Sequence, residues 1–349
     1  MIEKLIVYPT FNCNMRCSYC FYRKNNTEYL TFNNFKKAFK KFLKISINPS
    51  ITFLGGEALL NKKLLVKFIK HIKKIKKEMP VIIFSNGTLL DRKIVKFIKN
   101  NKIKLIISID GPKDINDKMR IYYKSSFESA FSNLKKYKLI DKVTVNMAVN
   151  KNNIKNLSDN VKYLYDTGFR KIGWNINYAD NWEINDIKTI KKQIKKVFLD
   201  YLKLIKNKKE IYEISNRYEI MDFLIKKEKN VCKNLILYPD GKFYLCDKVI
   251  NSKKLLLKND IIGEREKIFK KFSRKYPQKG LFCPLGIYFY LRYEKKFSSE
   301  IIRRKLNIIY SIMSIIEKNT IKFFKILLKY RDFRLKHNLS KKTSVMKYF

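Results

Sequence analysis

The sequence has few acidic residues, no export signal and no long apolar run. Only 30 Asp and Glu stand against 78 Lys and Arg, so the 349 residues carry a formal net charge of +48. Residues 1–9 alternate apolar and polar side chains like a strand, and they lack the basic and apolar regions of a signal peptide. The longest charge-free apolar run in the tail, 307–316, is too short to cross a bilayer. We therefore expect a cytoplasmic protein.

Cysteine and histidine are also scarce, with six Cys and two His. Without an export signal, the six Cys favour a reducing compartment and metal binding over disulfides. The excess of positive charge favours an acidic partner, namely an acidic peptide, nucleic acid or an anionic membrane surface, or it is simply a solvated surface. The lysines spread along predicted helix faces, which disfavours nucleic acid. His71 and His337 lie outside any motif and are predicted at the surface.

Apolar strands and amphipathic helices alternate over the first two thirds of the chain. The pattern predicts strands at 6–8, 51–54, 81–84, 104–109, 143–149 and 171–176, and helices at 32–45, 63–77, 91–100, 126–137, 154–167 and 183–206. Units of this length are typical of a parallel sheet with helical crossovers. Six units rather than eight predict an α/β fold with a partial, TIM-like (β/α)6 barrel.

Small and polar residues gather late in the predicted strands or just after them. They are Gly55, Gly56, Glu57, Ser85, Asn86, Gly87, Thr88, Ser108, Asp110, Gly111, Pro112, Asn146, Asn150, Asn175 and Asn177. In parallel barrels the carboxyl-terminal rim carries the site, so we expect one there. Gly55 and Gly56 lack a Cβ and would let the backbone approach a ligand, and Glu57 could accept hydrogen bonds from a cationic amine. Taken alone, Gly-Gly-Glu is also typical of an ordinary turn.

Three thiols, those of Cys13, Cys17 and Cys20, lie within eight residues and are separated by three and then two residues. This spacing lets one loop hold three corners of a cubane iron–sulfur cluster, which normally takes four thiolates. With three ligands, one iron stays open to bind and activate a further group. The alternatives are buried core thiols or a zinc site, although zinc ligands usually come from two paired loops.

This Cys loop, with Phe21-Tyr22 after it, resembles the signature of the radical S-adenosylmethionine (SAM) enzymes. The resemblance implies a [4Fe-4S] cluster with SAM on its open iron. It also implies an electron donor such as flavodoxin or ferredoxin, and hydrogen abstraction by a 5′-deoxyadenosyl radical. Gly55, Gly56 and Glu57 match the family motif that holds the methionyl ammonium of SAM, with Ala58 in place of the usual Pro.

Two further segments resemble parts of the family that line the cofactor. Ser85 and Asn86 lie in the first, and Ser108 in the second could hydrogen-bond the ribose or the carboxylate. Arg120 matches an Arg that pairs with the SAM carboxylate in the peptide-modifying branch, although Asn116 stands where that branch often has His. A bidentate Arg–carboxylate contact is chemically sensible. A turn followed by a surface Arg is the alternative.

From residue 211 onward the pattern changes. Cys232 and Cys246 bracket an apolar strand, a Pro-Asp-Gly turn and a second strand, which predict a hairpin. With Cys283, this segment resembles the SPASM/Twitch extension, which holds auxiliary clusters in radical enzymes that modify peptides and proteins. The three remaining Cys allow a second [4Fe-4S] cluster. A zinc site or plain core thiols are the alternatives. Asp247 matches the substrate-deprotonating base of anaerobic sulfatase-maturing enzymes, or it is a local hydrogen-bond acceptor.

The sequence thus predicts a radical SAM core at 1–210, a small SPASM/Twitch-like hairpin domain at 211–290 and basic C-terminal helices at 291–349. Ser298 or Ser299 and Thr320 are predicted helix caps, and the helices would pack on the core or contact an anionic membrane or a peptide. The predicted substrate is a peptide or protein, best an acidic ribosomally made precursor, as in the branch of RiPP maturases and sulfatase-maturing enzymes. RNA or a small molecule as substrate, and an inactive iron–sulfur protein, are the alternatives.

Overall fold

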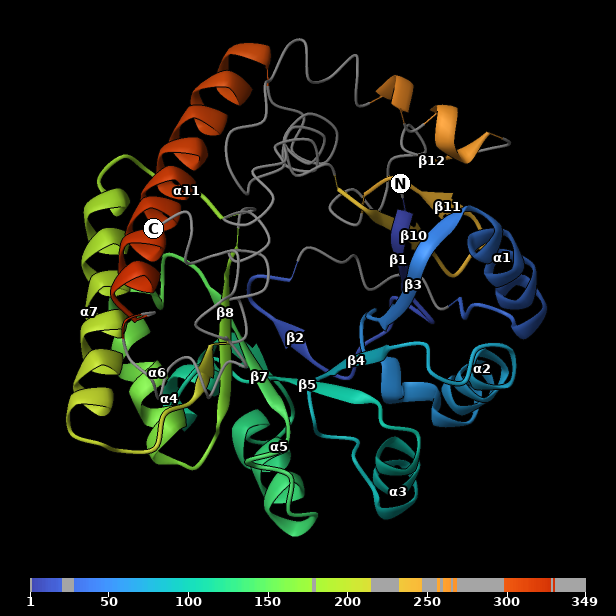
Figure 1. Cartoon of the computed structure of the whole chain (residues 1–349), viewed down its shortest axis with the longest axis horizontal. Helices are drawn as coiled ribbons and strands as arrows, with labels where there is room; N and C mark the ends of the chain where they lie inside the picture. The colour runs from blue at the N-terminus through green and yellow to red at the C-terminus, as the bar shows by residue number, and fades with distance from the viewer. Residues whose placement is uncertain are drawn as a thin grey trace.

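A curved, mostly parallel sheet with helices on its outer side organises the protein, as the computed structural model shows (Figure 1). The structure describes residues 2–20, 28–177, 180–214, 232–246, 256–257, 260–264, 266–268, 298–327 and 329. Within this part of the chain the predicted α/β class with a partial barrel is confirmed.

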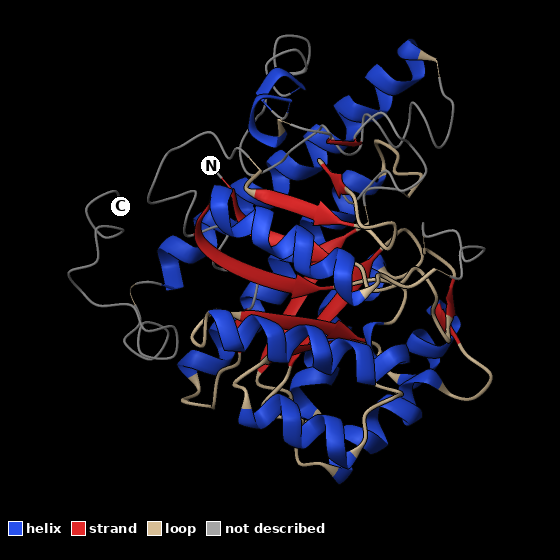
Figure 2. Ribbon diagram, turned by 90° about the vertical axis from the view of Figure 1, so that its right-hand side faces the viewer, coloured by secondary structure: helices blue, strands red, loops and turns tan. Residues whose placement is uncertain are grey.

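Six parallel strands form the centre of the sheet in chain order, as the sequence predicts. They are β1 (Ile2–Val7), β3 (Ser46–Phe53), β4 (Val81–Ser85), β5 (Lys104–Ser108), β7 (Thr144–Val149) and β8 (Lys171–Ile176). The helices between and after them are α1 (Phe32–Ile45), α2 (Lys62–Ile75), α3 (Arg92–Asn100), α5 (Ser126–Lys136), α6 (Leu157–Asp166) and α7 (Asp186–Lys206). These strands are parallel, and the strand arrows seen clearly in Figure 2 point toward the same side, where several connecting loops lie.

Additional strands extend the sheet on both sides. Next to β8 lies β9 (Glu213–Ile214), and next to β1 lies β10 (Asn234–Leu237), both parallel to their neighbours. The predicted hairpin is present, since β11 (Phe243–Tyr244) pairs antiparallel with β10 and is followed by β12 (Leu256–Leu257) at the edge. The hairpin therefore continues the main sheet.

Several short elements lie in the loops at the carboxyl ends of the strands. Two strands, β2 (Arg16–Cys17) and β6 (Arg120–Ile121), form a separate antiparallel pair. The others are the 3-10 helices η1 (Ala58–Asn61) and η2 (Ile154–Asn156) and the helix α4 (Lys113–Met119). The sequence pattern missed α4, because Asp110-Gly111-Pro112 indicates a turn and the helix that follows is only seven residues long.

Side-chain alternation along the strands separates an outer core from an inner face. The outer side of the sheet carries residues such as Val7, Phe53 and Ile107, which are fully buried under the helices. A second cluster of Ile6, Tyr8, Phe11, Ile236, Tyr238 and Tyr244 fills the inner side beside β1 and β10. This aromatic packing supports the start of the Cys loop.

The long helix α11 (Ser299–Leu327) packs against α7. Ile302, Leu306, Ile309 and Ile312 are buried, so the predicted packing against the core is confirmed for this stretch. The hydroxyl oxygen of Ser298 accepts a hydrogen bond from the Ile301 amide at 3.4 Å, which supports Ser298 as the cap. The prediction of a second cap at Thr320 is wrong, because the helix continues through this residue. No helix among the described residues is long and apolar enough to span a membrane.

Candidate functional site

The Cys loop directly follows β1, at the edge of the sheet where all six central strands end. Cys13, Cys17 and Cys20 are each partly exposed and form no disulfide. The Cys20 amide donates to the Cys17 carbonyl at 3.1 Å, so these two residues share a tight turn. Because Cys17 lies in β2 and pairs with Arg120 in β6, the loop is bound to the segment that follows β5.

Two side chains of the Cys loop, those of Asn14 and Tyr19, bind it to the ends of other strands. The first is Asn14. Its amide nitrogen donates to the Thr88 hydroxyl at 2.9 Å, and its side-chain oxygen accepts from Asn86 at 2.8 Å. Asn86 also points its amide nitrogen at the Cys13 sulfur, 4.0 Å away, and its own oxygen accepts from the Thr88 amide. The predicted site residue Asn86 is therefore in place beside the first thiol, as the partner of the loop.

The second contact comes from Tyr19, the residue just before Cys20. The Tyr19 hydroxyl donates to the Asp110 carboxylate at 2.6 Å, and the Arg120 guanidinium lies 5.5 Å from the centre of the Tyr19 ring. Burial, and then the neighbouring Asp110 charge, raise the pKa of Tyr19, and the Arg120 charge opposes them. This hydroxyl therefore stays protonated and acts as a donor.

Asp110 is a fully buried hub between the loop and the sheet. Besides Tyr19, its carboxylate accepts from Arg120 Nη2 at 2.8 Å and from the Ala148 amide of β7 at 2.8 Å. Burial alone would lower the pKa of Arg120, but the Asp110 carboxylate outweighs it and raises that pKa. The side-chain oxygen of Asn116 accepts a hydrogen bond from the Asp110 amide at 2.9 Å. Asn116, which stands where the peptide-modifying branch often has His, thus supports the backbone at Asp110.

Arg120 is thus buried and not a surface residue, with 8% of its side chain exposed. One terminal nitrogen is held by Asp110, while its buried Nε has no hydrogen-bond partner in the part of the chain that the structure describes. A buried donor of this kind is one that an anionic ligand can satisfy. The pairing of Arg120 with a SAM carboxylate stays a prediction.

Gly55, Gly56 and Glu57 form the loop after β3, and their backbone lies against the start of the Cys loop. The Gly56 amide donates to Thr10 and the Glu57 amide donates to the Asn12 carbonyl at 2.8 Å. A Cβ on Gly56 would lie 2.0 Å from the Asn12 carbonyl oxygen, and Gly55 has a φ of +132°. The structure thus shows the glycines bringing two backbone segments together.

The Glu57 carboxylate points into the protein and accepts three hydrogen bonds. Its partners are the Leu59 amide at 2.9 Å, the Ser85 hydroxyl at 2.8 Å and the Asn86 amide at 2.7 Å. Burial raises the pKa of Glu57, and the three donors oppose that shift. Glu57 and Ser85 therefore join the loops after β3 and β4. Contact of Glu57 with a methionyl ammonium stays a prediction.

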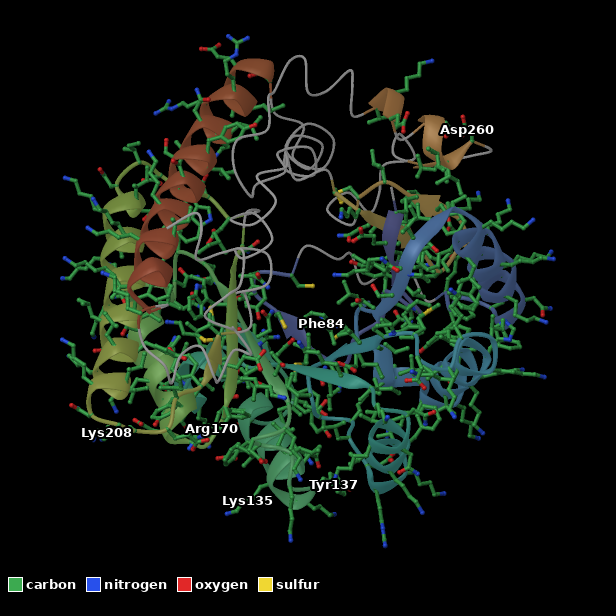
Figure 3. The ribbon with its side chains drawn as sticks, viewed as in Figure 1. Phe84, Lys135, Tyr137, Arg170, Lys208 and Asp260 are labelled. Carbon is green, nitrogen blue, oxygen red and sulfur yellow. The ribbon has the colours of Figure 1, made fainter. Side chains whose placement is uncertain are left out.

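Three polar residues line the inner face of the neighbouring strands β5, β7 and β8. Ser108 is paired in register with Asn146, and the Asn175 amide donates to Asn146 at 2.9 Å. All three retain solvent exposure, unlike the outer-face residues. Phe84 of β4, labelled near the middle of Figure 3, is partly exposed on the same face. This face is open toward the loop edge and could receive a ligand.

Sequence reasoning missed Asn14 and Tyr19 as site residues, and it placed Thr88 and Asp110 at the expected rim without giving either a role. The available signal lies in the Cys loop itself, because Asn14 and Tyr19 are polar residues between the three thiols. Their partners follow β4 and β5, which a parallel sheet brings to the same edge.

Of the predicted auxiliary residues, Cys283 and Asp247 lie outside the described residues. Cys232 and Cys246 are partly exposed thiols. The hairpin pairs Ile236 with Tyr244, so continuing that register places Cys246 two residues from Cys232 along β10. Both thus lie at the open end of the hairpin, away from the edge that carries the Cys loop. A cluster on these thiols stays a prediction.

The three thiols of the Cys loop are donors that suit an iron–sulfur cluster. Among the described residues, no three His, Cys, Asp or Glu side chains converge as on one metal ion. A zinc ion needs its thiolates about 2.3 Å from one centre. A cubane places each thiolate on a different iron, and three partly exposed, unoxidised thiols on one clamped loop suit that arrangement.

Comparison with known proteins agrees with this geometry. Residues 7–164 match the family model of the radical SAM superfamily. This match includes the Cys loop and agrees with the family that the loop predicts. An uncharacterised protein of Methanocaldococcus jannaschii is 31% identical over 181 residues, which cover 50% of this chain and 63% of that protein. A cysteine-type anaerobic sulfatase-maturating enzyme of Clostridium novyi is 31% identical over 186 residues, 48% of this chain and 49% of that enzyme.

The chain thus spans less than two thirds of the length of these two relatives. Among solved structures, anSMEcpe with bound AdoMet and the Cp18Cys peptide has a TM-score of 0.67 at 20% identity, covering 93% of this chain and 99% of that one. Streptococcus suis SuiB bound to S-adenosylmethionine has a TM-score of 0.55 at 12% identity, covering 76% and 64%. These likenesses show the fold.

Proposed function

We propose that this protein binds a [4Fe-4S] cluster on Cys13, Cys17 and Cys20, binds SAM beside it, and abstracts a hydrogen atom from a peptide or protein. The observation that carries the proposal is the clamped Cys loop within a radical SAM domain. When bound, the cluster supplies the electron that cleaves SAM to methionine and a 5′-deoxyadenosyl radical.

The residues of this chain have positioning roles in that reaction. Asn14 and Tyr19 fix the loop at both ends, so the three thiols keep their spacing as the cofactor is loaded. Arg120, with a buried Nε to satisfy, would hold an anionic group of SAM, and Ser108 would hold a hydroxyl or carboxylate. The Ser85 hydroxyl on the Glu57 carboxylate would hold the glycine loop to the end of β4, and the Glu57 amide would hold it to the start of the Cys loop.

A peptide or protein substrate is supported by two observations. The structural neighbours include anSMEcpe with the Kp18Cys peptide and SuiB with its precursor peptide SuiA. The net charge of +48 also suits an acidic peptide. Oxidation, cross-linking and epimerisation are the outcomes that we propose after hydrogen abstraction, with the substrate made as a ribosomal precursor.

The test is anaerobic reconstitution with iron and sulfide of the wild type and of the Cys13/Cys17/Cys20→Ala variant. We expect about four irons per chain that depend on this loop, or about eight falling to about four if Cys232 and Cys246 also help to hold a cluster. Reduced, loaded wild type should then form 5′-deoxyadenosine from SAM, and the variant should form none. Absence of iron from the wild type would overturn the proposal, and iron without 5′-deoxyadenosine would leave an inactive iron–sulfur protein.

A further inference from the structure

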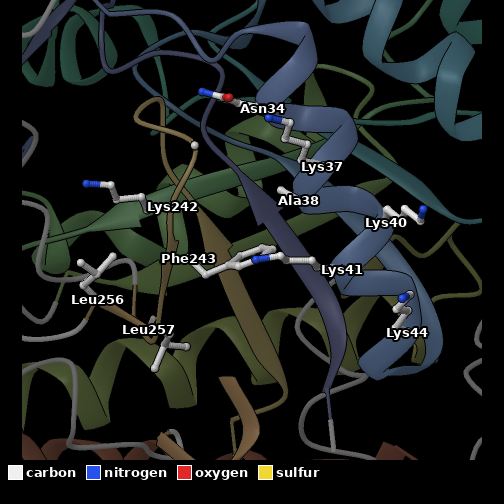
Figure 4. A pocket seen from close by; sticks show the side chains of 11 residues that line it. Asn34, Lys37, Ala38, Lys40, Lys41, Lys44, Lys242, Phe243, Leu256 and Leu257 are labelled. Carbon is white, nitrogen blue, oxygen red and sulfur yellow. The ribbon is translucent and has the colours of Figure 1, made fainter. Parts of the chain in front are cut away.

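A basic groove of about 640 Å³ runs along α1, between this helix and the hairpin edge of the sheet (Figure 4). Its apolar floor consists of Ala38, Phe243, Leu256 and Leu257. Its lysines are Lys37, Lys40, Lys41, Lys44 and Lys242. Figure 4 shows the α1 lysines along one wall, with Phe243, Leu256 and Leu257 opposite them. The groove is separate from the inner face of the barrel, because α1 covers the outer side of the sheet.

The sequence of α1 explains why the groove exists. Lys37, Lys41 and Lys44 are spaced by four and then three residues, so they lie on one face of the helix. Ala38 sits next to that face and is buried, and its small side chain leaves the floor hollow. Phe243 of β11 is 6% exposed and closes the floor from the other side.

The electrostatics of the groove favour an acidic occupant. None of its five lysines forms an ion pair with any described residue, and no Asp or Glu among the described residues lines it. Helix α1 itself contains no acidic residue. Lysines that converge on one groove without counter-charges raise the local concentration of anionic groups. An occupant with both carboxylates and apolar side chains would satisfy the walls and the floor.

The shape of the groove favours a peptide over nucleic acid or a membrane. Single-stranded nucleic acid needs exposed aromatic rings on which bases stack, and the lining ring of Phe243 is buried. A flat membrane surface cannot reach a concave floor. From Asn34 to Lys44 the helix rises about 15 Å, which an extended segment of about five residues spans.

One end of the groove lies at the edge of the sheet that carries the Cys loop. Gly241, in the turn after β10, packs so closely on Asn34 that a Cβ would lie 2.7 Å from the Asn34 amide nitrogen. Because β10 is parallel to β1, this turn lies where β1 ends. Just before α1, the Leu30 amide donates to the Pro9 carbonyl at 2.8 Å, next to the Cys loop. A chain that leaves the groove here is on the site side of the molecule.

We propose that this groove binds an acidic, amphipathic leader segment of the substrate peptide, and that the segment to be modified extends over the loop edge. The proposal rests on the proposed peptide substrate, and it adds where that substrate is recognised. Recognition is then remote from the chemistry, so the residue that is modified and the segment that is bound are read by different surfaces.

The experiment compares two variants of the holoenzyme with the wild type. The test variant is Lys37→Glu/Lys41→Glu/Lys44→Glu. The control variant is Lys188→Glu/Lys192→Glu/Lys195→Glu, which makes the same change at the same helical spacing on exposed positions of α7. A third variant with Gln at the three α1 positions removes charge without reversing it, and it serves if the Glu variant does not fold.

The probe is a short fluorescent peptide of alternating Glu and Leu, followed by anisotropy at physiological salt. Matched probes replace each Glu by Gln, or are an RNA oligonucleotide or an anionic vesicle. We expect the α1 variants to weaken binding of the Glu-Leu peptide by about tenfold or more. The α7 control should stay within about twofold of the wild type, and the Gln-Leu peptide should bind weakly to all proteins.

If both Glu variants bind the Glu-Leu peptide equally weakly, the proposed binding groove is overturned, because binding would follow the overall charge of the protein. Loss of RNA or vesicle binding in the α1 variants with unchanged Glu-Leu peptide binding would overturn the peptide assignment. Formation of 5′-deoxyadenosine without peptide is read in parallel. If the wild type forms none, the proposed function fails; if it does and the α1 variants bind the peptide normally, only the groove fails.

Discussion

The substitution Asp110→Asn separates the charge of the buried hub from its shape. The Asn oxygen can still accept from Arg120 and from the Ala148 amide, and the Asn nitrogen can donate to Tyr19, whose hydroxyl then accepts. What is lost is the negative charge beside Arg120, of whose side chain 8% is exposed. A buried charge without its partner costs about 3–5 kcal/mol, and we expect a loss of that size in the free energy of unfolding.

The assay is urea unfolding under anaerobic, reducing conditions, with the midpoint and the slope compared between variants. Asp91→Asn is the matched control, because Asp91 pairs with Lys62 at an exposed site and Asn can still cap α3, so about 1 kcal/mol or less is expected. Arg120→Met combined with Asp110→Asn removes both charges. The double variant should lose less free energy of unfolding than the two single variants lose together. The difference should be about 2 kcal/mol or more. A loss for Asp110→Asn no larger than that of the control, or strictly additive losses, would refute this account of the hub.

Three further predictions concern the supports of the Cys loop. Tyr19→Phe deletes the donor to Asp110, should cost about 1–3 kcal/mol in urea unfolding and should speed the loss of iron to a chelator; an unchanged iron-loss rate would contradict a positioning role. Gly56→Ala places a Cβ 2.0 Å from the Asn12 carbonyl, so we expect about 3 kcal/mol of destabilisation and reduced iron loading, checked by unfolding and iron analysis. Burial raises the pKa of Glu57, so the folded state binds the Glu57 proton more tightly than the unfolded chain does. The contribution of Glu57 to the free energy of unfolding therefore falls as pH rises from the ordinary Glu pKa of about 4.3. The stability advantage of the wild type over Glu57→Gln should therefore shrink as pH rises above about 4.3, and a pH-independent difference would count against the raised pKa.

The strands and helices of the barrel could be predicted because their hydrophobic periods are local. Helix α1 begins and ends where the pattern of Phe35, Phe39 and Phe42 predicts, and α3, which Asp91 caps, lies within the predicted helix at 91–100. The place of the hairpin could not be predicted in this way. Its pairing with β1 joins residues more than two hundred positions apart, such as Leu5 and Leu235, and no local pattern encodes such a partner.

The site was predictable as a place but not as a set of contacts. Polar residues after parallel strands meet at one edge, so Ser85, Asn86 and Ser108 were expected there from the sequence. Which of them would face a ligand depends on side-chain direction. In the structure Glu57 turns inward onto Ser85 and Asn86, a choice that depends on three donors from two separate loops.

The Cys loop is held in place mainly by polar contacts, and these contacts determine when the site forms during folding. The Cys loop has little apolar surface of its own to bury, apart from Met15, which is 2% exposed. Its position therefore depends on Asn14 and Tyr19, whose partners come from the ends of β4 and β5. Because these partners come together only when the parallel strands are paired, the thiols reach their spacing late, with the barrel already formed. Cluster loading should thus require a folded barrel, and variants that weaken the hub should lose iron under conditions where the sheet persists.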